Sequence, residues 1–179
     1  MLITVSGPPG SGTTTAATRV AKVLGLDMLP GGEVFRAMAA EHAMTLGEFG
    51  VYAAAQPTVD VELDRRLAAR AHQGDVVIES RLAGWILHNE GLDGVAVWIT
   101  CDDEVRAARV AARESLTVEQ ALAENAEREK LEHDRYLALY GIDSRDLSLY
   151  DLVLDSGRLE REQVAGRILA AADARSRRT

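Results

Sequence analysis

The sequence predicts an α/β fold of three layers, in which helices cover both faces of a parallel central sheet. Short apolar runs rich in β-branched residues, expected as strands, recur at residues 2–5, 75–79, 95–100 and 152–154. Stretches with apolar residues at helical spacing separate these runs. A glycine-rich turn joins the first run to a helical pattern, which is how a βαβ unit begins.

Periodicity and helix-end signals place the helices between the strands. The helical pattern that follows the first strand ends at Gly25, and Thr45 and Glu48 form a Thr-x-x-Glu capping box. Pro57 is expected to interrupt the chain between the third and fourth helices, and residues 175–179 are expected to fray. The predicted helices span residues 14–24, 32–42, 45–55, 59–72, 103–114, 118–140 and 161–174.

Composition and charge exclude several classes of protein. The net charge of −8 argues against a nucleic-acid or an anionic membrane surface as partner, although a local basic cluster can still bind a small anion. A single cysteine, Cys101, permits no internal disulfide and indicates a reducing compartment. The first residues, MLITVSG, lack the basic segment and long apolar run of a signal peptide. We therefore expect a soluble cytoplasmic protein, and a monomer.

The glycine-rich turn at residues 7–14 reads GPPGSGTT and stands where a Walker A loop belongs, between the first strand and the first helix. Glycines let backbone N–H groups converge on phosphate oxygens, and the helix N-terminus adds its positive end. The hydroxyl of Thr14 would bind Mg²⁺. The nucleotide-binding residues predicted from this pattern are Gly7, Pro8, Pro9, Gly10, Ser11, Gly12, Thr13, Thr14 and Thr15.

Two helical stretches flank this loop in a chain that otherwise alternates strands and helices. Residues 30–71 and 106–145 each run without an intervening strand, which makes them insertions between sheet strands. We find no repeat or linker, so residues 1–179 are expected to form a single domain. The insertions would then act as an acceptor clamp and a lid.

The Walker A pattern has a lysine where this chain has Thr13. That lysine reaches the transferring phosphates, and losing one such donor costs about 10²–10³ in rate. Three explanations stay open: an arginine from the lid region replaces the charge, the protein is a slow kinase, or it binds nucleotide without chemistry. The first is favoured because arginines are dense in that region, at Arg106, Arg109, Arg113, Arg128 and Arg135.

These arginines also have a plainer explanation, which is a solvated helix face with i,i+4 pairs to glutamate. It fits less well for Arg106, Arg109 and Arg113, whose spacing of three and four places like charges along one face of a helix. The spacing therefore favours a functional row of arginines over a solvated one.

Seven blocks of the chain, spread over nearly its whole length, resemble one family. They are GPPGSG (7–12), GGEVFRAMA (31–39), PTVDVELDRR (57–66), VIESRLAGW (77–85), the stretch 106–113, EREKLEHDRY (127–136) and YGIDSRDLSLYDLVLDS (140–156). In this order they resemble the archaeal-type cytidylate kinases, a branch of the nucleoside monophosphate kinases with the P-loop NTPase fold. Several blocks in the right order are much more specific than the loop alone.

The resemblance implies roles for residues near the phosphates. Gly32 and Arg36 match the acceptor helix, whose arginine holds the monophosphate, and Arg81 matches a second monophosphate arginine, with Gly84 in the same block. Glu79 stands where these kinases place an acid near the water shell of Mg²⁺. A local ion pair is the alternative for Glu79 and Arg81, but ligands collect at the carboxyl edge of a parallel sheet.

The resemblance extends to the predicted lid. Arg128, Glu132 and Arg135 match a helix whose arginines cover the phosphates and whose acid reaches the sugar of the acceptor. The chain departs from the family pattern at Ser80, where a glycine is usual, and at Thr13. Members that resemble this chain tolerate threonine at the lysine position, which favours a working enzyme.

Asp60, Asp64 and Arg65 match the block expected near the base, although an exposed helix face explains them nearly as well. The resemblance implies an enzyme that uses ATP and Mg²⁺ to phosphorylate small-molecule nucleotides, with CMP or dCMP the favoured acceptor. Two alternatives stay open: a same-fold kinase for a modified nucleotide or another small phosphate acceptor, and a nucleotide-binding protein with weak or lost catalysis.

The residues expected to stabilise the transferring phosphoryl group are Arg109, Arg113, Arg128 and Thr13. Because the acceptor phosphate is already an anion, the reaction requires no general base. A copy without catalysis need not keep monophosphate-binding arginines, so their presence argues against that alternative.

Overall fold

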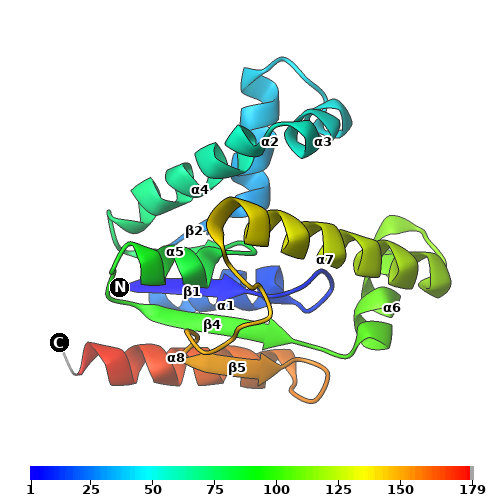
Figure 1. Ribbon diagram of the computed structural model, residues 1–179. Helices are drawn as coiled ribbons and strands as arrows, with labels where there is room; N and C mark the ends of the chain where they lie inside the picture. Colours follow the sequence, from blue (N-terminus) through cyan, green and yellow to red (C-terminus); the bar gives the residue numbers. More distant parts are fainter. Residues whose placement is uncertain (178–179) are drawn as a thin grey trace.

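A parallel sheet forms the centre of the protein, with the strand order β2-β3-β1-β4-β5 (Figure 1). The computed structural model describes residues 1–177. Val5 of the central strand pairs with Glu79 on one side and Val97 on the other, so the carboxyl ends of these strands finish at one edge. The strands are β1 (Leu2–Ser6), β2 (Asp27–Pro30), β3 (Val76–Glu79), β4 (Val95–Thr100) and β5 (Leu152–Asp155).

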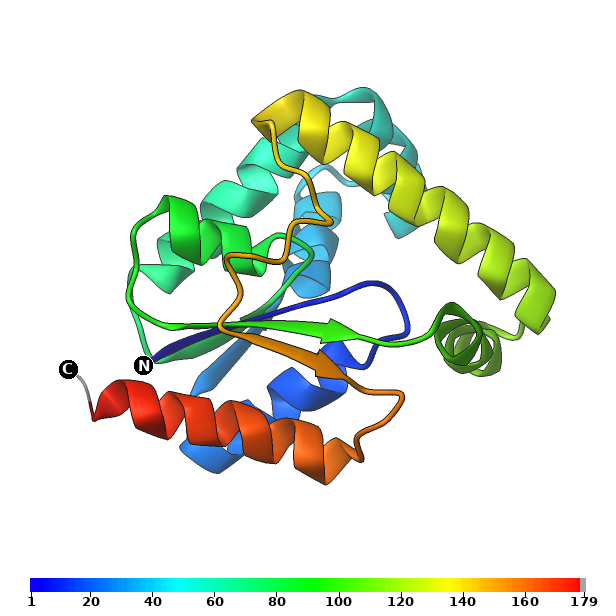
Figure 2. The same cartoon turned by 60° about the horizontal axis from the view of Figure 1, so that its bottom comes forward.

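Helices cover both faces of this sheet, which confirms the predicted three-layer α/β fold. Helices α1 and α8 lie on one face, and α4 and α5 lie on the other (Figure 2). The helices are α1 (Thr13–Leu24), α2 (Gly31–Glu41), α3 (Leu46–Ala55), α4 (Pro57–Ala71), α5 (Ala83–Asn89), α6 (Asp103–Glu114), α7 (Val118–Tyr140) and α8 (Arg161–Ser176).

Each face of the sheet has its own apolar core. Val5 packs with Val20 of α1 and Ile168 of α8 on one side, and all three side chains are fully buried. On the other side, Ile78 packs with Leu67 of α4. Each such side chain contributes about 1.5–3 kcal/mol through burial. The inner strands β1, β3 and β4 are buried on both faces, which explains why they appear in the sequence as continuous apolar runs.

Most predicted elements agree with the structure to within two residues at each end. Thr45 caps α3 and forms the predicted capping box with Glu48, through bonds in both directions. Pro57 marks the break between the third and fourth helices as expected: Gln56 before it is extended and ends α3, and Pro57 itself begins α4, where its missing N–H costs nothing. Helix α8 includes residues 175 and 176, and residues 178–179 lie outside the described part of the chain.

Two elements were not predicted. Strand β2 (Asp27–Pro30) contains no β-branched residue, and it is a strand because it pairs with the edge of β3. Proline is tolerated at that position because an edge strand has a free side. Helix α5 has only seven residues and carries Gly84 in its first turn, so its local helix signal is weak.

Helix α6 stands beyond the carboxyl edge of the sheet, toward which the strand arrows point, and α7 runs from it back over the sheet to the helices of the first insertion (Figure 2). Helices α2, α3 and α4 share a small core around Phe49, which is fully buried and contacts Phe35 at 4.8 Å between ring centres. Helices α6 and α7 form a hairpin that packs through Ala107 and Ala121. Each insertion is therefore held together by its own apolar contacts.

Candidate active site

A cleft of about 830 Å³ opens above the carboxyl edge of the sheet, between the phosphate loop, helices α2 to α4 and helix α7. It brings together residues that are up to 128 positions apart in the sequence, from Pro8 to Tyr136. The predicted site residues that line it are Pro8, Pro9, Gly10, Thr13, Thr14, Gly32, Asp60, Asp64, Glu79, Arg81, Arg113, Arg128, Glu132 and Arg135.

Glycines shape the phosphate loop at one end of the cleft. Gly10 and Gly12 have φ values of 79° and 91°, a left-handed conformation that side chains rarely adopt. Gly7 packs so closely on β4 that a Cβ there would lie 2.4 Å from the carbonyl oxygen of Ile99. Inside the loop, the Ser11 hydroxyl donates to the carbonyl of Pro8 at 2.8 Å. The loop is followed directly by the first turn of α1, whose free N–H groups can donate hydrogen bonds to an anion.

Three arginines donate to backbone carbonyls of this loop. The bonds run from Arg81 to Gly7, from Arg106 to Pro9 and from Arg109 to Gly10, at 2.9, 3.1 and 3.2 Å. Positive charge thus surrounds a loop that lacks the usual lysine. Arg81 comes from the end of β3, whereas the other two come from α6.

The row of arginines predicted along α6 is not uniform. Arg106 is 4% exposed, and its guanidinium bonds the carbonyl of Cys101 and the carboxylates of Asp103 and Glu129. It therefore links the loop to α7 and does not face the cleft. Arg109 also holds Ser156 through two bonds of 2.9 Å, and the largely exposed Arg113 lines the cleft.

A carboxylate joins two arginines beside the loop. Glu132 accepts from the Nε atoms of Arg81 and Arg128, each at 2.9 Å, and is 13% exposed. Burial raises the pKa of Glu132, but the two guanidiniums outweigh it and hold the pKa below its ordinary value. Both arginines line the cleft and carry further N–H groups, so together they can bind a phosphate.

The far end of the cleft is acidic and buried. The Oδ2 atom of Asp60 lies 2.9 Å from the Nε atom of Arg135, but the two atoms do not meet in hydrogen-bond geometry, and neither has a hydrogen-bond partner among residues 1–177. Burial raises the pKa of Asp60, although Arg135 lowers it. Asp64 accepts a 2.8 Å bond from the Tyr140 hydroxyl, and burial raises the pKa of Asp64 to about 6. Partly satisfied buried carboxylates are costly, and a ligand with N–H groups would offset that cost.

Several predicted site residues lie away from the cleft lining. Arg65 is exposed on α4 and pairs with Glu62, and Arg36 is exposed beside Gly32. Gly84 is buried in α5, where an added Cβ would lie 2.2 Å from the ring of Tyr150. Close packing by that ring is sufficient reason for a glycine at this position.

Aromatic residues of the cleft were missed by sequence reasoning. Phe35 and Tyr136 line it, and Tyr140 donates to one of its carboxylates. Phe35 and Tyr136 directly neighbour Arg36 and Arg135, two arginines already singled out. That adjacency is a weak signal, because helix neighbours face different directions and only the packing decides which of them meets the ligand.

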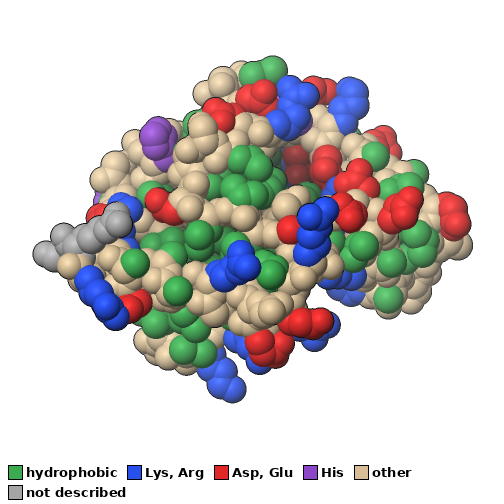
Figure 3. Space-filling view, turned by 90° about the horizontal axis from the view of Figure 1, so that it is seen from below, with side chains coloured by type: hydrophobic (Ala, Val, Ile, Leu, Met, Phe, Trp, Pro, Cys, Tyr) green, Lys and Arg blue, Asp and Glu red, His purple; other side chains and the backbone are tan. Residues whose placement is uncertain are grey.

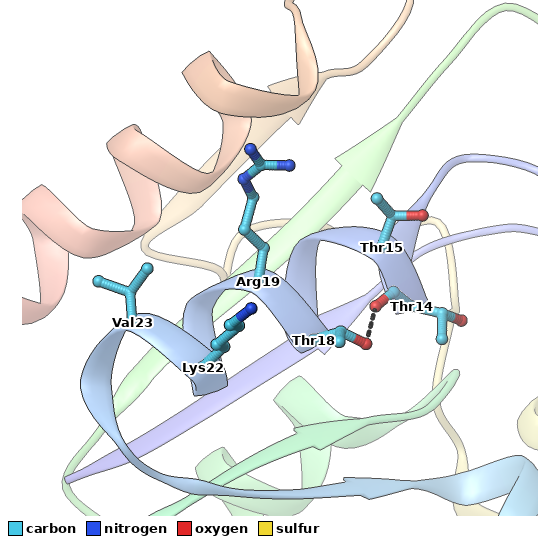
Figure 4. A pocket seen from close by; sticks show the side chains of 6 residues that line it. All are labelled: Thr14, Thr15, Thr18, Arg19, Lys22 and Val23. Carbon is cyan, nitrogen blue, oxygen red and sulfur yellow. Dashed lines mark hydrogen bonds between the residues drawn. The ribbon is translucent and has the colours of Figure 1, made fainter.

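A second, shallower groove of about 670 Å³ runs along α1 from the end of the phosphate loop (Figure 4). Thr14 and Thr15 lie at its start, so the predicted nucleotide-binding Thr15 lies here rather than in the main cleft. The Thr18 hydroxyl donates to the carbonyl of Thr14 at 2.8 Å. Arg19 points toward α8, where it pairs with Glu162.

Charge on the surface is mixed. In the face shown in Figure 3, acidic and basic side chains are interspersed among hydrophobic and neutral ones. None of the helices within residues 1–177 is long and apolar enough to cross a membrane.

Known proteins resemble this chain along its length. A cytidylate kinase from Pyrococcus horikoshii is 46% identical over 173 residues, which is 97% of this chain and 88% of that protein. This chain belongs to the cytidylate kinase family. A second cytidylate kinase, from Methanopyrus kandleri, is 44% identical over 180 residues, covering 97% of this chain and 93% of that protein.

Two further comparisons concern the fold. A family model described as an AAA domain matches residues 3–132, which include the phosphate loop and most of α7. The crystal structure of a shikimate kinase from Bacteroides thetaiotaomicron has a TM-score of 0.61 at 12% identity and covers 97% of both chains. That likeness shows the fold alone. The predicted family and its P-loop kinase fold are thereby confirmed, and membership of such a family implies the use of ATP.

Proposed function

We propose that this protein transfers the γ-phosphoryl group of ATP to CMP or dCMP, which yields ADP and the corresponding diphosphate. One observation carries the proposal: a single cleft joins the phosphate loop to a second phosphate-binding cluster around Arg81, Arg128 and Glu132. Phosphoryl transfer needs this arrangement, because the donor and acceptor phosphates must meet in line. The names of the curated relatives support CMP as the acceptor.

In this proposal no general base is needed, and arginines supply the positive charge of the missing lysine. The acceptor phosphate attacks the γ-phosphorus directly, and the guanidiniums absorb the charge that spreads over the transferring oxygens. Arg109 lies against the donor loop, while Arg81 and Arg36 serve the acceptor phosphate. The side chains of Arg113 and Arg128 are largely exposed, and they would turn from their partners Glu114 and Glu132 toward the transferring group.

Magnesium fits the residues at the same end of the cleft. Thr14 and Glu79 both line it and offer only oxygen atoms, which are the ligands that Mg²⁺ prefers. In the proposed site, the hydroxyl of Thr14 would bind the ion directly, and Glu79 would hold it through water. The ion would supply positive charge to the phosphate oxygens.

The acidic end of the cleft is proposed to select the base. Cytosine presents an amino donor beside two acceptors, so a carboxylate can accept from the amino group while a guanidinium donates to the acceptors. Asp60 and Arg135 form such a pair, and because their Oδ2 and Nε atoms make no hydrogen bond within residues 1–177, a ligand that donates to one and accepts from the other would satisfy both. Asp64 and Glu132, on either side, would contact the base and the sugar.

The insertions have matching proposed roles within a single domain of residues 1–179. Residues 30–71 would clamp the acceptor, and residues 106–145 would close as a lid that excludes water from the phosphates. We further propose a monomer. The single cysteine, Cys101, is buried and free, which suits the reducing conditions of the cytoplasm.

A coupled assay of ADP release tests the function, with ATP and a panel of CMP, dCMP, UMP and AMP. We expect the largest kcat/KM with CMP or dCMP. If the protein binds ATP but turns over none of these acceptors, the proposal that it is an enzyme is wrong. If it phosphorylates AMP or UMP but not CMP, the proposed acceptor is wrong.

Variants sharpen the same assay. Arg81→Ala should lower kcat/KM for CMP by about 10²-fold, because a charge-assisted contact to the acceptor is lost. Arg167→Ala, a matched arginine exposed on α8 across the sheet, should leave kcat/KM within about twofold of the wild type. Equal effects of the two variants would mean that Arg81 does not bind the acceptor.

A further inference from the structure

Thr13 occupies the position of the missing lysine, and its side chain is firmly held. It is 7% exposed, and its hydroxyl donates to the Oε1 atom of Glu79 at 2.8 Å. Its methyl group packs on Gly7, where an added Cβ would lie 2.9 Å from that methyl carbon. A β-branched side chain with both branches in contact has one orientation available. Thr13 is therefore fixed with its hydroxyl toward the end of β3.

That geometry separates Thr13 from the phosphates. A hydroxyl has one proton to donate, and the carboxylate of Glu79 already takes it. Thr13 cannot give the same proton to a phosphate oxygen, and its side chain is much too short to reach across the loop as a lysine does. The hydroxyl of Thr13 therefore acts on Glu79, its hydrogen-bond partner, and not on the nucleotide.

Glu79 is a carboxylate with few other partners. It makes no ion pair with a lysine or arginine within 4.0 Å among the described residues, since Arg81 is held by Glu132 and by Gly7. A lysine at position 13 would put an ammonium beside this carboxylate and compete with any metal ion for its charge. The neutral hydroxyl orients Glu79 through a charge-assisted bond and leaves its negative charge uncancelled.

We propose that Thr13 is a positioning residue for the divalent cation, and that it acts by orienting Glu79 rather than by touching the phosphates. The inference rests on the proposed function, because it requires that Mg²⁺ binds with ATP beside Glu79. It replaces the expectation that Thr13 itself stabilises the transferring phosphoryl group. It predicts that Thr13 affects only the part of nucleotide binding that depends on magnesium.

The test measures the Kd for ATP by calorimetry, once in EDTA and once in excess Mg²⁺, so it needs no turnover. In EDTA, Thr13→Val and Thr13→Ala should bind ATP like the wild type. In Mg²⁺, both variants should lose about tenfold in affinity, the effect of one hydrogen bond to a charged group. Thr13→Ser keeps the hydroxyl and should keep the affinity. Thr18→Val, the same change one turn further along α1, is the matched control.

A double-mutant cycle identifies the partner. Glu79→Gln should weaken ATP binding in Mg²⁺, and adding Thr13→Val to it should cause no further loss, because the two residues act as one unit. Independent losses that multiply would overturn the proposal. So would an equal loss in EDTA, which would make the hydroxyl a phosphate ligand, or wild-type affinity of both Thr13 variants in Mg²⁺.

Failure of the inference can be told apart from failure of the proposed function. If the wild type turns over CMP and the variants bind Mg²⁺–ATP normally, only the inference is wrong. If the wild type binds no ATP in either buffer, the proposed function is wrong and the inference falls with it. Melting curves of each variant show that a loss of affinity is not a loss of fold, and Thr13→Ala replaces Thr13→Val if the valine variant does not fold.

Discussion

Replacement of Asp64 by asparagine should change how the stability of the protein depends on pH. Asp64 lies at the closed end of the cleft, on α4, and accepts a bond from Tyr140 on α7. Burial raises the pKa of Asp64 to about 6, although the bond from Tyr140 opposes this, and the neighbouring Asp60 raises it further while Arg135 lowers it. Asparagine has nearly the same shape and can accept the same bond, but it carries no charge at any pH.

The size of the effect follows from the two pKa values. The carboxyl has a pKa of 3.8 when exposed and about 6 in the folded protein. Between these values the folded state binds more protons than the unfolded state, so the wild type loses stability as the pH rises from 4 to 6. The shift of about two units corresponds to about 3 kcal/mol at most. The asparagine variant lacks this loss. The difference in free energy of unfolding between the variant and the wild type should therefore shift by up to about 3 kcal/mol in favour of the variant between pH 4 and 7.

Urea unfolding at pH 4, 5, 6 and 7 measures this difference between Asp64→Asn and the wild type. Asp134→Asn is the matched control, because that exposed carboxyl has a pKa lowered by a hydrogen bond from Lys130. Its stability relative to the wild type should stay nearly constant from pH 4 to 7, because a carboxyl with a lowered pKa is ionised in both the folded and the unfolded state over this range. If the difference in free energy of unfolding between Asp64→Asn and the wild type does not change with pH, or favours the wild type at pH 7, then the folded protein does not raise the pKa of Asp64.

Three further changes test the packing and the cleft. Gly84→Ala should destabilise the fold by about 1–3 kcal/mol, because the added methyl meets an aromatic ring. Gly166→Ala on α8 is the control: its added methyl meets no atom within 4 Å, so it should stabilise the fold by up to about 1 kcal/mol. Similar unfolding midpoints of the two variants would contradict this difference in packing. Arg106→Met should cost about 1–3 kcal/mol in urea unfolding, since it leaves the carbonyls of Pro9 and Cys101 without their buried donor. An unchanged free energy of unfolding would show that this arginine does not hold the loop to α7. Asp60→Asn should reduce the preference for CMP over UMP by about tenfold, because an amide can donate as well as accept; an unchanged ratio of kcat/KM values would remove Asp60 from base selection.

The fold was readable from the sequence wherever a local signal was strong. The run at 95–100 is buried on both faces and has no polar interruption, so its strand was evident. Thr45 and Glu48 indicate the start of a helix, because the hydrogen bonds of their capping box lie within four consecutive residues. Strand β2 carries no such signal, because it owes its structure to a partner strand almost fifty residues away.

The candidate site divides in the same way. The phosphate loop could be recognised from the glycine spacing at residues 7–12 alone, because a loop of this kind depends on its backbone. Glu79 and Arg81 could be recognised because they stand at the carboxyl end of a predicted strand. The burial of Arg106 was not predictable, because helical spacing places three arginines on one face without saying what packs against each of them. The same holds for Arg65, which shares its helix with two carboxylates of the cleft and yet faces away from it.

The sequence by itself determined that this protein has a P-loop fold and a loop without the Walker A lysine, and it predicted a second set of arginines for a phosphate. These features are local patterns of a few residues, or blocks that keep their order along the chain. Only the tertiary structure decided what stands beside Thr13, because its hydrogen bond to Glu79 joins residues 66 positions apart. Such a contact depends on how β3 and α1 lie against each other, which is a property of the packed sheet and of no single segment.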